Sequence, residues 1–175
     1  VSGLDMSASY HFDTGWGRFN FSGSVTQFLR FVESYGGSAK YSIVNTVGIN
    51  STFPSIARQA RLAAGWDRED YSLELYVNNV GGYRNWGSGT VNPLVLDTNG
   101  NVSSGGDYVR SWTTVDLHAS WDFSHGGLLA KSQVYIDVNN VFNEAPPFFN
   151  NANGYDPYGA NPLGRVMSLG LRVRY

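Results

Sequence analysis

The segment WTTVDLHASWDF, residues 112–123, alternates apolar and polar side chains at almost every position. In an extended strand one face would hold Val115, Leu117, Ala119, Trp121 and Phe123, and the other Thr114, Asp116, His118, Ser120 and Asp122. A helix would instead bring together residues three and four apart, which would mix the two sets. The segment therefore predicts a β-strand with one apolar and one polar face.

Six further stretches show the same period of two, whereas helical periodicity is hard to find. They are Leu4–Phe12, Arg18–Phe31, Ile56–Trp66, Tyr71–Val80, Gln133–Phe142 and Arg165–Tyr175. The sequence therefore predicts an all-β chain of seven long antiparallel strands.

Charged side chains avoid the apolar face of these stretches and recur on the polar face. The polar face holds Asp5, His11, Arg61, Glu74, Asp116, His118, Asp122, Asp137, Arg172 and Arg174. Contact with lipid imposes such a rule, because an Arg or Lys at the bilayer midplane of a barrel costs about 2–4 kcal/mol. The core of a soluble β-sandwich imposes it too, so alternation alone leaves both architectures open.

The connections between the strands alternate between short and long. Asp13–Gly17, Asp67–Asp70 and Ser124–Ser132 are short, whereas Val32–Ser55, Gly81–Ser111 and Asn143–Gly164 are long. Transmembrane barrels have this asymmetry, and loops of twenty residues or more are uncommon in compact soluble domains.

Aromatic residues of the apolar face gather at the end with the short turns. They are Tyr10, Phe12, Phe19, Trp66, Tyr71, Trp121, Phe123 and Tyr175. Rings at one height are typical of the aromatic girdle at a membrane interface. Seven strands are an odd number, and the edges of an open sheet would be unpaired in lipid. The sequence therefore predicts a transmembrane barrel section that further strands close.

Composition narrows the function classes. Aromatic and charged residues each make up 15%, the net charge is −2, and there is no cysteine. A net charge of −2 gives no basic surface for binding nucleic acid. Without cysteine the chain has no thiolate ligands for a metal site. No apolar run reaches the length of a transmembrane helix. We expect no metal, no cofactor and no nucleic-acid partner.

Four motifs mark the C-terminal part of the chain: Val138-Asn-Asn-Val-Phe-Asn143 leading into Pro146-Pro-Phe148, Gly154-Tyr-Asp-Pro157, Asn161-Pro-Leu-Gly-Arg165 and the terminal alternation that closes on Tyr175. With these motifs the chain resembles the end of a TonB-dependent receptor of the Gram-negative outer membrane. The N-terminal stretch from Leu4 to Gly17, with Phe12-Asp-Thr-Gly-Trp-Gly17, also resembles a hairpin of such barrels.

This resemblance implies a plugged barrel of about 22 strands, of which residues 1–175 form the C-terminal seven. It implies uptake of a siderophore, vitamin or carbohydrate-like nutrient, with energy supplied through the TonB system. The plug and the earlier strands would lie elsewhere in the same gene or on another chain. The lipid of the outer membrane and the barrel-assembly machinery would be further partners.

Three sets of residues are predicted to act in such a receptor. Asp5, Arg61, Glu74, Asp116, His118, Asp137 and Arg172 would face the lumen and hydrogen-bond to the plug and to one another. Tyr83, Arg84, Trp86, Phe148, Phe149, Tyr155, Asp156 and Tyr158 lie in long loops, where they would stack on and hydrogen-bond a small-molecule ligand, or instead pack the loops together. Leu169, Leu171, Val173 and Tyr175 of the last strand resemble the signal that the assembly machinery recognises.

Two alternatives remain open from the sequence. One is a secreted β-sandwich that binds carbohydrate and buries the apolar face as its core. The other is an outer-membrane hydrolase in which Asp116 and His118 form an acid/base pair or part of a metal site. No nucleophile elbow or phosphate-binding glycine loop favours an enzyme, so we expect none.

Overall fold

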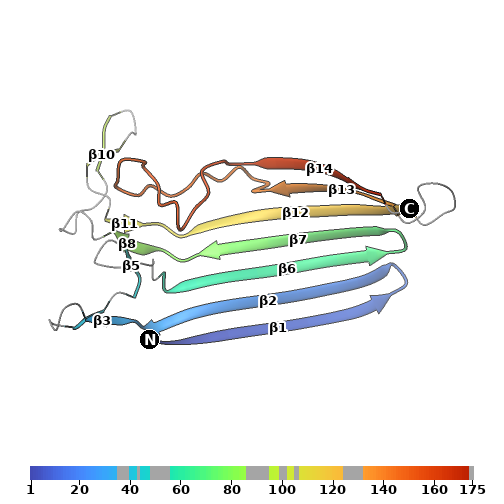
Figure 1. The fold of residues 1–175 in the computed structure, drawn as a ribbon, viewed down its shortest axis with the longest axis horizontal. Coiled ribbons are helices and arrows are strands. Elements are labelled where there is room, and N and C mark those ends of the chain that lie inside the picture. The colour runs from blue at the N-terminus through green and yellow to red at the C-terminus, as the bar shows by residue number, and fades with distance from the viewer. Residues whose placement is uncertain are drawn as a thin grey trace.

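The computed structural model describes residues 1–34, 40–42, 44–47, 56–85, 95–98, 102–104, 107–123 and 132–173. Its main element is one sheet of seven strands that follow one another in sequence order (Figure 1). They are β1 (Ser2–Thr14), β2 (Gly17–Arg30), β6 (Arg58–Arg68), β7 (Tyr71–Val80), β12 (Trp112–Phe123), β13 (Ser132–Asn139) and β14 (Val166–Arg172). Each neighbouring pair is antiparallel. The predicted all-β class and the seven strands are confirmed.

Seven short strands lie within the long connections. β3 (Val32–Ser34) pairs with β4 (Lys40–Ser42), and β9 (Val95–Leu96) pairs with β10 (Val102–Ser104). β5 (Thr46–Val47) and β11 (Tyr108–Val109) flank β8 (Tyr83–Asn85) in a sheet of three. Figure 1 shows these strands at one end of the main sheet and the tight turns after β1 and β6 at the other. We call these the loop end and the turn end.

The boundaries of β1, β2, β6, β13 and β14 differ from the sequence prediction. β6 begins at Arg58 and continues to Arg68, two residues beyond the predicted end. β13 ends at Asn139 rather than at Phe142, because Asn140 adopts a left-handed backbone with φ of 54°. A left-handed residue breaks the extended ladder, and asparagine is one of the few residues that tolerates this conformation.

The cross-strand register keeps the apolar residues together on one side of the sheet. Tyr10 pairs with Phe21, Leu62 with Val77, and Leu117 with both Leu75 and Val138. This apolar face is largely exposed: Leu62 retains 54% of its accessible surface, and Leu169 on β14 retains 77%. A β-sandwich would cover it with a second sheet, and no strand among the described residues does so.

The uncharged part of the apolar face is bounded by an arginine at each end of β6. The pleat places Arg58 and Arg68 on the same side as Ala60 and Leu62, so the predicted absence of charge holds only between them. The two arginines are ten residues apart in β6, which is about 33 Å along a strand. If these strands were tilted by about 40°, as in outer-membrane barrels, the uncharged band would be about 25 Å tall, the height of the apolar band of such barrels.

The predicted gathering of aromatic rings at the turn end is present among the described residues. The ring of Phe12 stacks on those of Phe19 and Phe21, at centroid distances of 5.4 and 6.1 Å. On the other side of the sheet centre, the Tyr71 and Trp121 rings stack at 6.2 Å. Tyr175 lies outside the described residues.

The packed core lies at the loop end, beyond the main sheet. Ile56, Tyr83, Val109 and Phe149 are buried there and form one cluster against Val80. These residues come from all three long connections, so the loops share one small core. At the lateral edges, β1 pairs only with β2 and β14 only with β13 among the strands described. The described sheet is therefore open.

Candidate functional site: the polar face and the loop cluster

On the polar face, one residue from each strand of the main sheet lies in a single row that crosses the sheet. The register aligns His11, Asn20, Gly65, Glu74, His118, Asp137 and Ser168 in one row across the sheet. Four other predicted polar-face residues lie on the same side in other rows: Asp116 in the adjacent row, and Asp5, Arg61 and Arg172 further away. All seven residues predicted to face a lumen therefore share one face.

A chain of hydrogen bonds crosses this face from β6 to the end of β13. Arg61 donates from Nη1 to Asn78 Oδ1 over 3.0 Å, and Asn78 donates from Nδ2 to Asp116 Oδ2 over 2.7 Å. The other oxygen of Asp116 accepts from the backbone N–H of Asn140 over 2.8 Å. The Arg61 guanidinium also lies over the Tyr76 ring, 4.2 Å from its centre. This series of hydrogen bonds therefore holds β6, β7, β12 and the turn after β13 to one another.

His118 has a different set of partners from Asp116. Its Nδ1 lies 2.6 Å from Asp137 Oδ1, and both side chains are about a third exposed. On the other side of His118 the register places Glu74, which accepts a hydrogen bond from Tyr76. Among the described residues no hydrogen bond joins Asp116 to His118, although they are two apart on one strand. No group of three or more His, Asp or Glu suited to a metal ion occurs in the described part of the chain.

Glycine permits one close packing contact on this face. A Cβ on Gly170 of β14 would lie 2.1 Å from the ring of Tyr135 on β13, so this ring occupies the space above the glycine. On β1, β2 and β6, the small side chains of serines and alanines leave a shallow polar recess beside Arg61 and Tyr76. The face thus has bulky polar groups over β7, β12 and β13 and a hollow over β1 and β2.

At the loop end, three of the predicted ligand-binding residues are buried. The Tyr83 hydroxyl donates to Asp156 Oδ2 over 2.6 Å, and Phe149 packs against the Tyr83 ring at 6.3 Å. Gly159 makes room for this pair, since a Cβ there would lie 3.1 Å from the Tyr83 hydroxyl. Burial and the bond to Asp156 raise the pKa of the Tyr83 phenol above its usual value. Tyr83, Phe149 and Asp156 therefore join the loops, which is the packing role that the sequence left open.

The other loop candidates remain at the surface. Tyr158 is 77% exposed, Arg84 is exposed, and Phe148 and Tyr155 are half-buried. Trp86 lies outside the described residues. Ligand contact by the surface residues stays a prediction.

The predicted assembly residues of β14 lie on the exposed apolar face at the sheet edge. Leu169 and Leu171 retain 77% and 63% of their accessible surface, and Val173, just after the strand, retains 47%. Recognition of these residues by an assembly partner stays a prediction.

Sequence reasoning missed the role of asparagine at the base of the third long loop. Asn140 exchanges two hydrogen bonds with the Glu144 backbone, and Asn143 Oδ1 accepts from the Arg165 N–H over 2.9 Å. Gly164 allows this approach, since a Cβ there would lie 2.6 Å from Asn143 Oδ1. The motifs that carry the family resemblance on either side of this loop therefore meet in space and close its base.

Comparison of the chain with known protein families, with curated proteins and with solved structures finds no match. Within the described residues no helix combines the length and apolar character needed to cross a membrane.

Proposed function

We propose that the chain is the C-terminal section of a Gram-negative outer-membrane barrel that takes up a nutrient with energy from the TonB system. The observation that carries this proposal is the exposed apolar face, uncharged between Arg58 and Arg68. Such a face is stable in hydrocarbon, whereas in water it would expose far more contiguous apolar surface than a soluble monomer does.

The open edges support a larger barrel. In lipid an unpaired edge strand would leave a row of N–H and C=O groups without partners. Additional strands would pair with β1 and β14 and close the wall. The family resemblance favours a total of about 22, which leaves a lumen wide enough for a plug domain.

The polar face would then line the lumen. Its cross-strand network, from Arg61 through Asn78 to Asp116, would stiffen the wall. Groups that remain partly exposed, such as His118 and Asp137, would be available to the plug. The long loops, which share the packed core at the loop end, would surround the extracellular opening. There Tyr155, Tyr158 and Arg84 would contact a small polar or aromatic ligand. In this proposal the chain carries out no catalysis.

Localisation of the complete protein tests the membrane assignment. We expect it in the outer-membrane fraction, resistant to alkaline wash and soluble only in detergent. Recovery in the soluble fraction without detergent would exclude a transmembrane barrel and favour a secreted binding module.

Uptake assays test the transport assignment separately. Cells would be offered labelled ferric siderophores, cobalamin and oligosaccharides, with and without an active TonB system. We expect uptake of one of these classes that requires both this protein and TonB. Membrane insertion without energised uptake, together with hydrolytic activity lost on Asp116→Ala or His118→Ala, would instead assign an outer-membrane hydrolase.

A further inference from the structure

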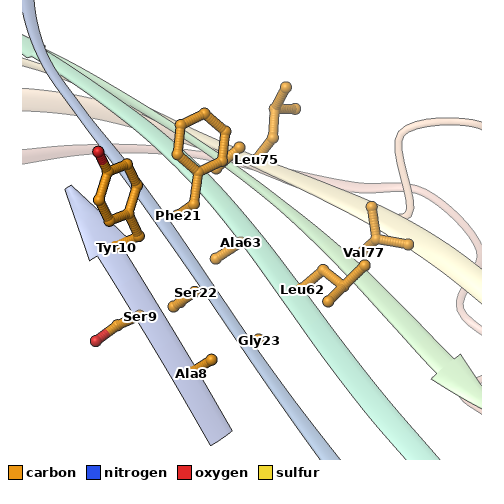
Figure 2. A pocket seen from close by; sticks show the side chains of 11 residues that line it. Ala8, Ser9, Tyr10, Phe21, Ser22, Gly23, Leu62, Ala63, Leu75 and Val77 are labelled. Carbon is orange, nitrogen blue, oxygen red and sulfur yellow. The ribbon is translucent and has the colours of Figure 1, made fainter. Parts of the chain in front are cut away.

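The apolar face contains a hollow of about 620 Å³ over β1, β2, β6 and β7. Small residues form it, namely Ala8, Gly23 and Ala64, and larger side chains border it, including Tyr10, Phe21 and Val77. Figure 2 shows the rings of Tyr10 and Phe21 at one end of the hollow, with Ala8 and Gly23 at the other. The hollow thus interrupts the otherwise bulky surface between the aromatic rings and the loop end.

A cationic side chain lies on the same face, in line with the hollow. Arg58 is four residues from Leu62, which also lines the hollow, so the guanidinium is attached about 13 Å further along β6 toward the loop end. The intervening position on this face is the small Ala60. Arg58 is exposed and has no carboxylate partner among the residues that the structure describes. Gln27, opposite Arg58 in the register, adds a polar side chain.

We infer that this surface binds a phosphate-bearing lipid, with an acyl chain in the hollow and the phosphate at Arg58. The inference rests on the proposed function, because it requires the apolar face to lie in a bilayer. The hollow is apolar and accepts hydrocarbon, while Arg58, which has no carboxylate partner in the described part of the chain, matches an anionic group. The loop-end position of Arg58 assigns the lipid to the leaflet on the side of the long loops.

Two substitutions test the two halves of the site. Ala64→Leu fills the hollow, and Arg58→Gln removes the cation. The matched controls are Ala119→Leu, on the same face of β12 but outside the hollow, and Arg68→Gln, at the opposite end of β6. The complete protein would be purified from outer membranes in mild detergent, and retained lipid would be measured by native mass spectrometry and phosphorus analysis.

We expect the unmodified protein and both controls to retain a phosphate-bearing lipid. Arg58→Gln should lower its retention about tenfold, the effect of losing one charge-assisted contact. Ala64→Leu should lower it by a similar factor, because the leucine side chain would take the space of the acyl chain. In add-back experiments the same lipid with its phosphate removed should bind as weakly to the unmodified protein as the intact lipid binds to Arg58→Gln.

Three results would overturn the lipid site. Equal retention by Arg58→Gln and the unmodified protein would do so, as would equally tight binding of inorganic phosphate, which would indicate an ion site only. Dissociation of an oligomer by Ala64→Leu but not by Ala119→Leu would show that a second copy of the protein occupies the hollow. Recovery of the protein in the soluble fraction would instead refute the proposed function, so the two failures are distinguishable.

Discussion

Replacing Leu75 by arginine places a charge at the middle of the uncharged band. Leu75 lies on the apolar face of β7, between the levels of Arg58 and Arg68, and it retains 42% of its accessible surface. If hydrocarbon covers this face, the substitution should lower the free energy of unfolding by about 2–4 kcal/mol, because an arginine at the midplane of a barrel must draw water or headgroups inward. This corresponds to a roughly 30- to 700-fold change in the folding equilibrium.

Thr113→Arg is the matched control for this experiment. Thr113 lies on the same face near the loop end, opposite Asn79, where polar groups already border the band. There an arginine should cost only about 0–1 kcal/mol. Denaturant titration of the complete protein folded into lipid vesicles would measure both values. If water covered this face, both substitutions would change stability by no more than about 0.5 kcal/mol. Equal costs at the two depths would refute a bilayer around these strands.

Three further predictions concern particular side chains. Asn140→Ala should lower the free energy of unfolding by about 1–3 kcal/mol, because it removes two hydrogen bonds and leaves a left-handed backbone; Asn140→Gly, which tolerates that backbone, should cost less in the same denaturant titration. Because the Tyr83 pKa is raised on folding, the stability that its neutral form contributes should be lost as pH rises above about 10. The protection of loop amides against hydrogen exchange, relative to the unfolded chain at the same pH, should therefore fall in that range. Tyr83→Phe should remove this fall while loosening the contact with Asp156 at neutral pH. Deletion of Tyr175 should lower the amount of barrel inserted in the outer membrane more than it lowers uptake per inserted molecule, and unchanged insertion measured by surface labelling would contradict this.

The main sheet could be predicted because its information is local. A period of two assigns each residue to a face, and a slip of one residue between β7 and β12 would bring Leu117 opposite Glu74 or Tyr76 in place of Leu75. The two-residue turns after β1 and β6 then require antiparallel neighbours, so strand order followed from the spacing of the stretches.

The loop cluster could not be predicted in the same way because its contacts are distant in sequence. Tyr83 and Asp156 are 73 residues apart, and neither lies in an alternating stretch. A tyrosine beside Arg84 suits a ligand as well as it suits a buried partner. Burial, which decides between these roles, depends on how Ile56 and Val109 from other segments pack around the ring. The left-handed backbone of Asn140 was missed as well. Asn140 interrupts the alternation where an apolar residue would follow Val138, but one polar residue there does not distinguish a turn from an irregular strand end.

The location of the packed core links the fold to the proposed environment. Burial is deepest where three loops meet, while the seven long strands have no apolar layer behind them among the described residues. A soluble sheet gains most of its stability from such a layer. Here the hydrogen-bonded ladders and the polar network hold the strands to one another, and the apolar face has to be stabilised by its surroundings. In the proposed barrel a bilayer would supply that contact on one side, and neighbouring strands would supply backbone partners at the edges of β1 and β14. The exposed face and the open edges fit the same proposed setting, and a single charged residue at mid-height tests whether hydrocarbon covers the face.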